Sequence, residues 1–173
     1  MERLDLKRLT GARLDPFPLL ADDAPPPADG AVRVSLARLE ADGGHLFAAA
    51  RRLGVEVPAE TSAERLRPWL DRLALVAIEV PTFSDGRVFS LARRLREQFA
   101  FGGEIRATGH LLADQAEFLL RSGVDSVEVP SLRVIESMRH RLQLYGLWYQ
   151  DAVDARPTIV ELRHGRTRRR LAS

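Results

Sequence analysis

The sequence predicts an α/β protein whose mostly parallel sheet of three to five strands is built from consecutive strand–helix units, after an irregular N-terminal arm. Two observations carry this prediction. Short apolar runs end at proline or glycine at residues 73–80, 105–108 and 126–129. Amphipathic patterns with helical spacing separate these runs, at residues 87–99 and 112–122. Short strands that alternate with helices pair side by side in parallel, so we take residues 73–130 as the core of the fold.

The individual elements of this core follow from local patterns. Residues 73–80 are almost continuously apolar, as expected of a strand that is covered on both faces. In the turn that follows, Ser84 or Asp85 is placed to cap the next helix. Ser122 and Gly123 have the composition of a helix C-cap before the third strand.

Further elements are expected on both sides of the core. Those before it are a strand at 31–36, a helical turn at 36–40, a helix at 46–53, an extended piece at 55–57 and a helix at 63–72. We expect Gly54 to end the second of these helices, and Pro68 to kink the third or delay its start. Those after it are a helix at 132–144, an aromatic cluster around Trp148 and a strand at 158–162.

The chain divides into three parts by composition. Residues 1–30 are rich in proline and aspartate and are expected to form a partly disordered arm. Residues 31–162 form the predicted single α/β domain, and residues 163–173 form a basic tail. Whether the sheet closes part of a (β/α) barrel or is completed through a homodimer stays open at this level.

Composition excludes several classes of function. The chain of 173 residues has no cysteine, which excludes disulfides, thiol catalysis and cysteine-ligated zinc or iron–sulfur clusters. Its longest apolar run, at residues 73–78, is too short to span a bilayer. The N-terminus lacks the apolar segment of a secretory signal, so we expect a cytoplasmic protein.

Charge is distributed unevenly along the chain. Five of the 26 basic residues lie in the last eleven positions, which leaves a mildly acidic body with 21 basic and 24 acidic side chains. Such a tail can contact nucleic acid or an acidic partner. We favour a solvated terminus over nucleic-acid binding, because no aromatic residues lie between the arginines.

A candidate functional edge follows from the predicted topology. In an open parallel sheet, ligands bind at the carboxyl ends of the strands, where helix N-termini favour anions. The polar residues expected at or near this edge are Asp85, Arg87, Ser90, Arg93, Arg106, His110, Asp114 and Gln115. Each also has a simpler role: Asp85 in a turn, for example, and Arg87 and Arg93 on a solvated helix face.

Two residues of this set raise specific expectations. Arg106 is a charge inside a predicted buried strand and needs an acidic partner, for which Asp85, Asp114 and Glu104 are nearest on this topology. His110 and Asp114 are spaced to share one face, but two ligands are too few for a metal site, so no metal is expected. No dinucleotide fingerprint, phosphate loop, nucleophile elbow or kinase motif is present, so we expect no cofactor.

Several core segments have a distinctive order of residues, at 81–87, 89–96, 103–109, 112–115 and 121–123. Together they resemble an uncharacterised bacterial family, a domain of unknown function whose members are labelled "oxidoreductase probably involved in sulfite reduction" and are encoded beside assimilatory sulfite reductase. Two positions depart from the family pattern: His110 stands where the family has aspartate, and Ser122 stands where it usually has cysteine. The resemblance implies sulfate assimilation as the pathway, whereas no redox-cofactor motif supports the oxidoreductase label.

Three hypotheses of function follow, and whether the protein is an enzyme stays open. The first is an accessory protein of assimilatory sulfite reduction that binds sulfite reductase or another sulfur-assimilation protein, with Asp85, Arg87, Arg106 and Asp114 as an ion-pair network that shapes a docking edge. The second is a small enzyme or anion-binding protein in which Arg87 and Arg106 hold sulfite, sulfate or phosphate and His110 donates a proton. The third is a nucleic-acid-binding regulator that uses the arginine-rich tail.

Overall fold

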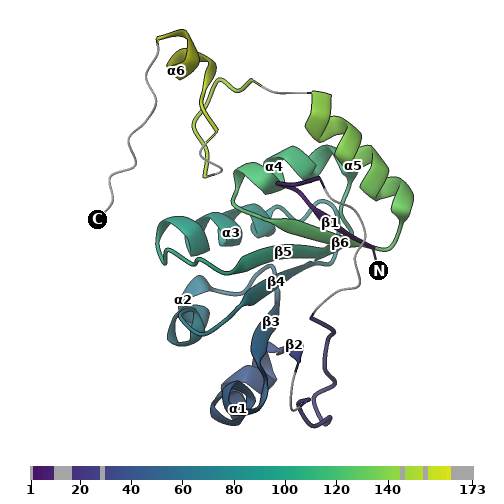
Figure 1. Ribbon diagram of the computed structural model, residues 1–173, viewed down its shortest axis with the longest axis vertical. Coiled ribbons are helices and arrows are strands. Elements are labelled where there is room, and N and C mark those ends of the chain that lie inside the picture. Colours follow the sequence, from purple (N-terminus) through teal and green to yellow (C-terminus); the bar gives the residue numbers. More distant parts are fainter. Residues whose placement is uncertain (1, 10–16, 28–29, 145–146, 154–155, 165–173) are drawn as a thin grey trace.

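The computed structural model describes residues 2–9, 17–27, 30–144, 147–153 and 156–164. Its centre is a six-stranded sheet in the order β1-β6-β5-β4-β3-β2 (Figure 1). The strands are β1 (Glu2–Asp5), β2 (Ala31–Ser35), β3 (Arg52–Pro58), β4 (Leu75–Val80), β5 (Glu104–Gly109) and β6 (Ser126–Val129). All neighbours pair in parallel except β1, which runs antiparallel to β6. The predicted mostly parallel sheet is therefore confirmed, with more strands than the three to five expected.

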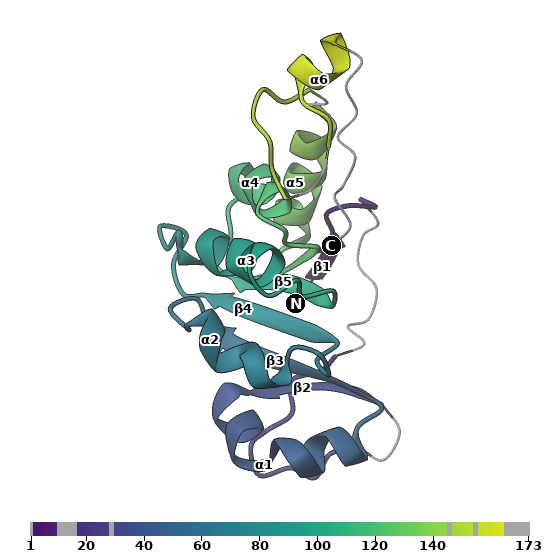
Figure 2. The same cartoon turned by 90° about the vertical axis from the view of Figure 1, so that its left-hand side faces the viewer.

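The helices follow the strands along the chain. They are α1 (Leu36–Ala49), α2 (Ala63–Leu66), α3 (Arg87–Glu97), α4 (Ala116–Arg121), α5 (Leu132–Leu144) and α6 (Ile159–Arg163), with 3₁₀ turns η1 (Arg67–Trp69) and η2 (Ala113–Gln115). Strands β2 to β6 are adjacent in chain order, so successive right-handed crossovers move in one direction and place their helices on one face. Figure 2 shows this layer of helices beside the sheet. The strand order is that of consecutive barrel units, but the sheet stays open, with β1 and β2 at its edges.

The two faces of the sheet differ in chemistry because side chains alternate along each strand. The face toward the helices is apolar, with Val34, Val55, Ile78, Ile105 and Val127 fully or almost fully buried in the main core. The opposite face, which we call the helix-free face, carries most of the charged strand residues. Their register places them on it: Arg33, Glu56, Glu79, Glu104, Arg106 and Glu128.

The helix-free face also has a small apolar cluster near its centre. Leu75 and Ala77 of β4 are fully buried there against Phe17, which belongs to the N-terminal segment. Figure 1 shows this dark blue segment on the side of β2 away from α1. The nearly continuous apolar run of β4 therefore does reflect a strand that is covered on both faces.

The prediction of an irregular arm over residues 1–30 was wrong at its start. Residues 2–5 form β1, which pairs with β6 from Glu2↔Val129 to Asp5↔Ser126. Leu4 and Leu6 are fully buried in the main core. A four-residue strand with three charged residues has little local signal, and pairing with the otherwise open edge of β6 supplies what the sequence pattern lacks.

Two predictions around glycine residues were also wrong. The predicted turn at 36–40 and helix at 46–53 are not separate, because α1 continues through Gly43 and Gly44 with a kink at Asp42, whose φ and ψ are −136° and 22°. Trp69 packs so closely there that a Cβ on Gly43 would lie 2.9 Å from its ring. Gly54 ends no helix but lies inside β3, where a Cβ would meet the Cβ atoms of Leu75 and Arg33 at 3.0 and 3.3 Å.

The other elements differ less from the predicted ones, with one exception. The predicted helix at 63–72 is α2 followed by η1, which contains Pro68, and the helix predicted at 112 begins as η2 before α4. The exception is the predicted strand at 158–162, which is helix α6. Thr158 and Glu161 form a capping box there, and this local signal outweighs the β-branched composition.

The predicted basic tail lies almost wholly outside the described residues, which end at position 164. Tyr145 of the predicted aromatic cluster also lies outside them, whereas Trp148 is buried and Tyr149 is exposed. Within the described ranges, no helix combines the length and apolar character needed to cross a membrane.

Candidate functional site

The loop after β4 holds the first pair of predicted site residues. Arg87 is the first residue of α3, and its guanidinium donates to Asp85 through Nε at 2.9 Å and Nη2 at 2.7 Å. The same carboxylate accepts the backbone N–H of Arg87 at 3.1 Å. These hydrogen bonds lower the pKa of Asp85 to about 2, and they raise that of Arg87. Glu60 lies 3.7 Å from Arg87, so this exposed guanidinium faces the exposed carboxylate of Glu60 and that of Asp85, whose side chain is only 8% exposed. The N-cap residue of α3 is Gly86, so the predicted cap by Ser84 or Asp85 was wrong.

Gln115 connects this loop to the next one. Its Nε2 donates to the backbone carbonyl of Phe83 at 2.8 Å, and its Oε1 accepts the backbone N–H of Leu112 at 2.9 Å. One amide side chain therefore holds the loop after β4 against the loop after β5. Since both loops begin at the carboxyl end of a strand, Gln115 fixes the shape of the predicted edge.

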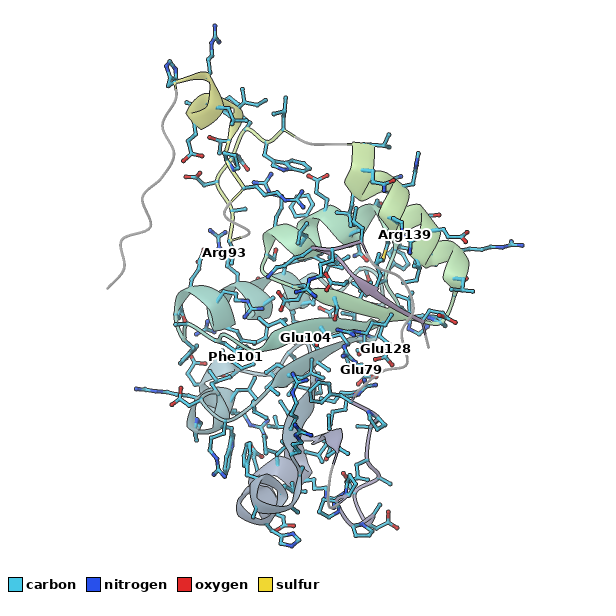
Figure 3. The ribbon with its side chains drawn as sticks, viewed as in Figure 1. Glu79, Arg93, Phe101, Glu104, Glu128 and Arg139 are labelled. Atoms are coloured by element: carbon cyan, nitrogen blue, oxygen red, sulfur yellow. The ribbon has the colours of Figure 1, made fainter. Side chains whose placement is uncertain are left out.

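The remaining edge residues are exposed and contribute no reactive arrangement. His110 and Asp114 are both exposed, with the backbone N–H of His110 bonded to Val80 at 3.0 Å. Ser90 is exposed on α3, and Arg93 points away from the sheet in Figure 3 and pairs with Glu97 at 3.0 Å. Among the residues that the structure describes, no group of three or more His, Asp or Glu side chains could hold a metal ion.

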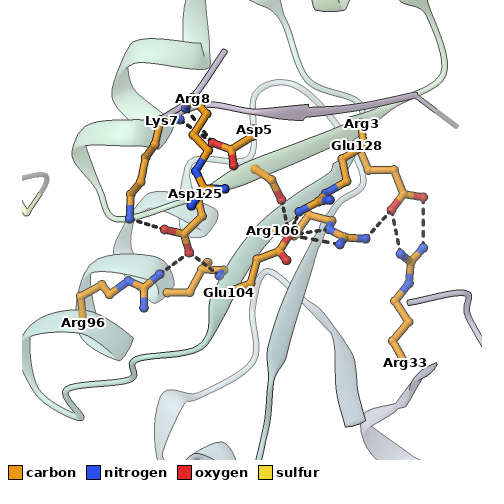
Figure 4. Close-up of polar contacts among 12 residues, drawn as sticks. Arg3, Asp5, Lys7, Arg8, Arg33, Arg96, Glu104, Arg106, Asp125 and Glu128 are labelled. Carbon is orange, nitrogen blue, oxygen red and sulfur yellow. Dashed lines mark hydrogen bonds and ion pairs between the residues drawn. The ribbon is translucent and has the colours of Figure 1, made fainter. Parts of the chain in front are cut away.

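Arg106 does not belong to this edge, which corrects the predicted network with Asp85, Arg87 and Asp114. It lies on the helix-free face and is fully buried. Its guanidinium donates to Glu104 Oε1 through Nε at 3.2 Å and Nη2 at 3.1 Å, and to Glu128 Oε2 through Nη1 at 3.2 Å (Figure 4). Glu104 was one of three expected partners, and Glu128 was not foreseen. Arg106 and Arg87 therefore do not form one anion site.

The contacts of Arg106 are part of a larger buried network. Arg33 of β2 binds Glu128 with two hydrogen bonds, at 2.7 and 3.1 Å, and Glu56 at 2.7 Å. Glu104 Oε1 also accepts from Ser126 Oγ at 2.6 Å and from Arg3 Nη2 at 2.8 Å. This network joins β1, β2, β3, β5 and β6 across the helix-free face.

The network lowers the pKa values of both carboxylates, that of the partly buried Glu104 and that of the buried Glu128. Burial by itself raises the pKa of Glu104, but Arg106, Ser126 and Arg3 outweigh it and hold the pKa below its ordinary value. Burial likewise opposes ionisation of Glu128, whose pKa is nevertheless lowered by hydrogen bonds and charge from Arg33 and by Arg106. Buried charges require this degree of pairing, because an unpaired one costs several kcal/mol.

Sequence reasoning missed Arg33 and Glu128, although a signal was present. Both residues lie between valines in short strands, in the segments AVRVS and SVEV. A charge flanked by apolar residues at a spacing of two indicates a strand with one charged face. Opposite charges in two such strands predict a pair across the sheet.

Several other residues in or next to the segments that resemble the family also stabilise the fold. The Arg96 guanidinium bonds Asp125, the carbonyl of Phe101, that of Gly103 at 2.9 Å and that of Gly123 at 3.1 Å. Asp125 in turn accepts the backbone N–H of Ile105 at 2.8 Å. Gly123 has a φ of 98°, and a Cβ there would lie 2.6 Å from Arg96 Cγ. This part of the motif is structural.

The carboxyl edge carries a feature of another kind, an exposed apolar side chain in or just after each of three successive loops. They are Phe83 after β4, Leu112 after β5 and Leu132 at the start of α5 after β6, with exposed fractions of 58, 45 and 53%. We call these three residues the edge patch. Gln115 contacts the backbone of the first two residues, and η2 packs against α5, so the three loops are neighbours.

Comparison with known proteins places the chain in a family. No curated protein matches the sequence. The model of the family described as "Bacterial protein of unknown function (DUF934)" matches residues 54–160, which include β4, β5, β6 and all the loops of the candidate edge. The chain belongs to this DUF934 family.

Proposed function

We propose that this protein is an accessory protein of assimilatory sulfite reduction that binds sulfite reductase through the edge patch. The observation that supports the proposal is the row of exposed apolar side chains at Phe83, Leu112 and Leu132. Clustered exposed apolar residues rimmed by polar groups mark interaction surfaces on soluble proteins. The choice of partner rests on the resemblance to proteins encoded beside assimilatory sulfite reductase.

The polar groups around the edge patch fit the rim of a docking surface. Asp85 and Arg87 are already paired with each other, so a partner does not have to neutralise an isolated charge. Gln115 holds two of the three loops in place, which lowers the entropy lost on binding. His110 and Asp114 remain exposed beside the patch and are free to make rim contacts.

The anion-binding hypothesis has less support. It needs Arg87 and Arg106 to hold one ligand, but Arg106 is fully buried on the helix-free face and bonded to two glutamates. The third hypothesis depends on the arginine tail, most of which lies outside the described residues. We therefore favour the accessory role over both alternatives.

The proposal is tested by binding of the purified chain to immobilised sulfite reductase haemoprotein. We expect micromolar binding by the wild-type protein and at least about tenfold weaker binding by Phe83→Ser, because a central aromatic anchor carries much of an interface's energy. Tyr149→Ser is the matched control, since Tyr149 is 77% exposed but lies far along the chain from the edge loops. It should bind as the wild type does.

Two results would count against the proposal. The first is the absence of micromolar binding by the wild-type chain, and the second is equal binding by Phe83→Ser and Tyr149→Ser. The pathway is tested separately by growth of a deletion strain on sulfate and on cysteine. Growth on sulfate that matches the parent strain would remove sulfite reduction from the proposal, whatever the partner.

A further inference from the structure

The loops after β4 and β5 are joined at two points, one at the strand ends and one farther along the loops. At the strand ends, Val80 pairs with Gly109, and the backbone N–H of His110 bonds the Val80 carbonyl at 3.0 Å. Farther along, Gln115 Nε2 donates to the Phe83 carbonyl at 2.8 Å. Among the described residues, no other side-chain hydrogen bond joins the two loops. The second connection therefore depends on one amide group.

The contact between Gln115 and Phe83 is not needed to start the helical turn that Gln115 belongs to. Gln115 is the last residue of η2, and its Oε1 accepts the backbone N–H of Leu112, the residue before η2, at 2.9 Å. This is one half of a capping box, and glutamate serves there as well as glutamine. A carboxylate is also favoured near the start of a helix by the helix dipole. Only the bond to Phe83 requires an N–H donor, so that bond explains why an amide serves better than a carboxylate at this position.

We propose that Gln115 couples the two loops, so that a change in the position or mobility of Phe83 changes that of Leu112. The two ends of one amide bond the backbones of these two residues, so displacement of either loop strains the contact with the other. Groups that order one another bind a common partner cooperatively. The coupling is a property of the free protein. Its consequence, that Phe83 and Leu112 bind as one unit, rests on the function proposed above.

The coupling is tested in the free protein by ¹⁵N relaxation of the variant Gln115→Glu. Glutamate keeps the acceptor for Leu112 but turns a carboxylate oxygen toward the Phe83 carbonyl, which repels it. We expect the amide order parameters of residues 82–85 to fall from about 0.85 to below about 0.6, although the substitution lies in the other loop. Hydrogen exchange at the Leu112 amide should stay as slow as in the wild type.

Two further variants complete this test. Gln115→Met removes both hydrogen bonds and should also speed exchange at the Leu112 amide. Gln143→Glu makes the same change of charge at an exposed glutamine on α5, and it should leave the order parameters of residues 82–85 unchanged. Unchanged order parameters in Gln115→Glu would overturn the proposal, because that is the result expected if Gln115 only caps η2.

Binding to sulfite reductase haemoprotein measures the consequence of the coupling. Phe83→Ser and Leu112→Ala are compared singly and together, in the wild-type background and with Gln115→Glu. In the wild-type background, the double variant should lose about threefold less affinity than the product of the two single losses, because each change already weakens the other contact. With Gln115→Glu the losses should multiply.

The outcomes of the binding experiment separate the two proposals. Losses that multiply in both backgrounds would overturn the joint action of Phe83 and Leu112. Absence of binding by the wild-type chain, or full binding by Phe83→Ser, would refute the proposed function alone. The relaxation of Gln115→Glu would still decide whether the loops are coupled.

Discussion

Arg87 and Arg106 form the same kind of contact in two opposite environments. Each guanidinium donates to a carboxylate two residues before it in the chain, Arg87 to Asp85 and Arg106 to Glu104. The Arg87 side chain is 59% exposed, whereas Arg106 is fully buried and bonded to a second glutamate as well. The local sequence is similar in the two cases, so burial alone separates a surface pair from a structural network.

The Asp85–Arg87 pair and the buried pairs of Arg106 should contribute very differently to the free energy of unfolding. A surface ion pair gains little, because water screens the charges and two long side chains must be held in place. In a buried pair, removal of one partner leaves an uncompensated charge out of water. The network around Arg106 should therefore determine whether the sheet holds together, while the pair at Arg87 should affect only the surface of the edge.

The largest effect is expected for Arg106→Ala. It leaves Glu104 and Glu128 with fewer partners on the helix-free face, and loss of about 3–5 kcal/mol in the free energy of unfolding is typical for such a change. Urea denaturation measures it. Arg93→Ala is the matched control, because Arg93 is exposed on α3 and pairs with Glu97 only across one helical turn. Equal stability of the two variants would refute the assignment of Arg106 to a structural network.

An intermediate effect is expected from pH. The native pKa values of Glu104 and Glu128 lie below the ordinary value of 4.5, so the unfolded chain binds more protons as the solution is acidified. Stability that is fully present above pH 4.5 is therefore lost as the pH falls through the native values. Glu128→Gln should flatten this slope in urea denaturation below pH 4.5, and Glu97→Gln should not. A wild-type slope in Glu128→Gln would contradict the network.

The smallest effect is expected for Asp85→Asn. The asparagine still accepts the backbone N–H of Arg87 but loses the ion pair, in which the Arg87 side chain is 59% exposed and screened by water. We expect a free energy of unfolding that urea denaturation cannot distinguish from that of the wild type near neutral pH. A loss of stability comparable to that of Arg106→Ala would show that the Asp85–Arg87 pair is part of the structural core. It would refute the distinction between this pair and the network around Arg106.

The segments that resemble the family contain both structural residues and residues of the exposed edge. Arg96, Arg106 and Gly123 lie in the segments that resemble the family, and their contacts hold strands and turns together. Phe83 and Gln115 lie in the same segments but form and support an exposed edge. The motif as a string gives no sign of this division, because both groups mix charged, small and apolar residues.

Local pattern by itself determined the elements of the core. The three apolar runs became β4, β5 and β6, and the helix predicted at 132–144 is α5 with the same bounds, because helical spacing is a local signal. The strand–helix alternation also determined that the sheet is mostly parallel and that Asp85, Arg87 and Gln115 lie at a carboxyl edge. These features depend on neighbours within a few residues, which a single sequence displays.

Only the tertiary structure decided what lies across the sheet. It paired β1 with β6, placed Gly54 inside a strand, and brought Arg33 to Glu128 over a separation of 95 residues. It also moved Arg106 from the predicted edge to the helix-free face. The physical reason is that the face a strand residue occupies, and the partner it meets there, depend on register with strands far away in the chain.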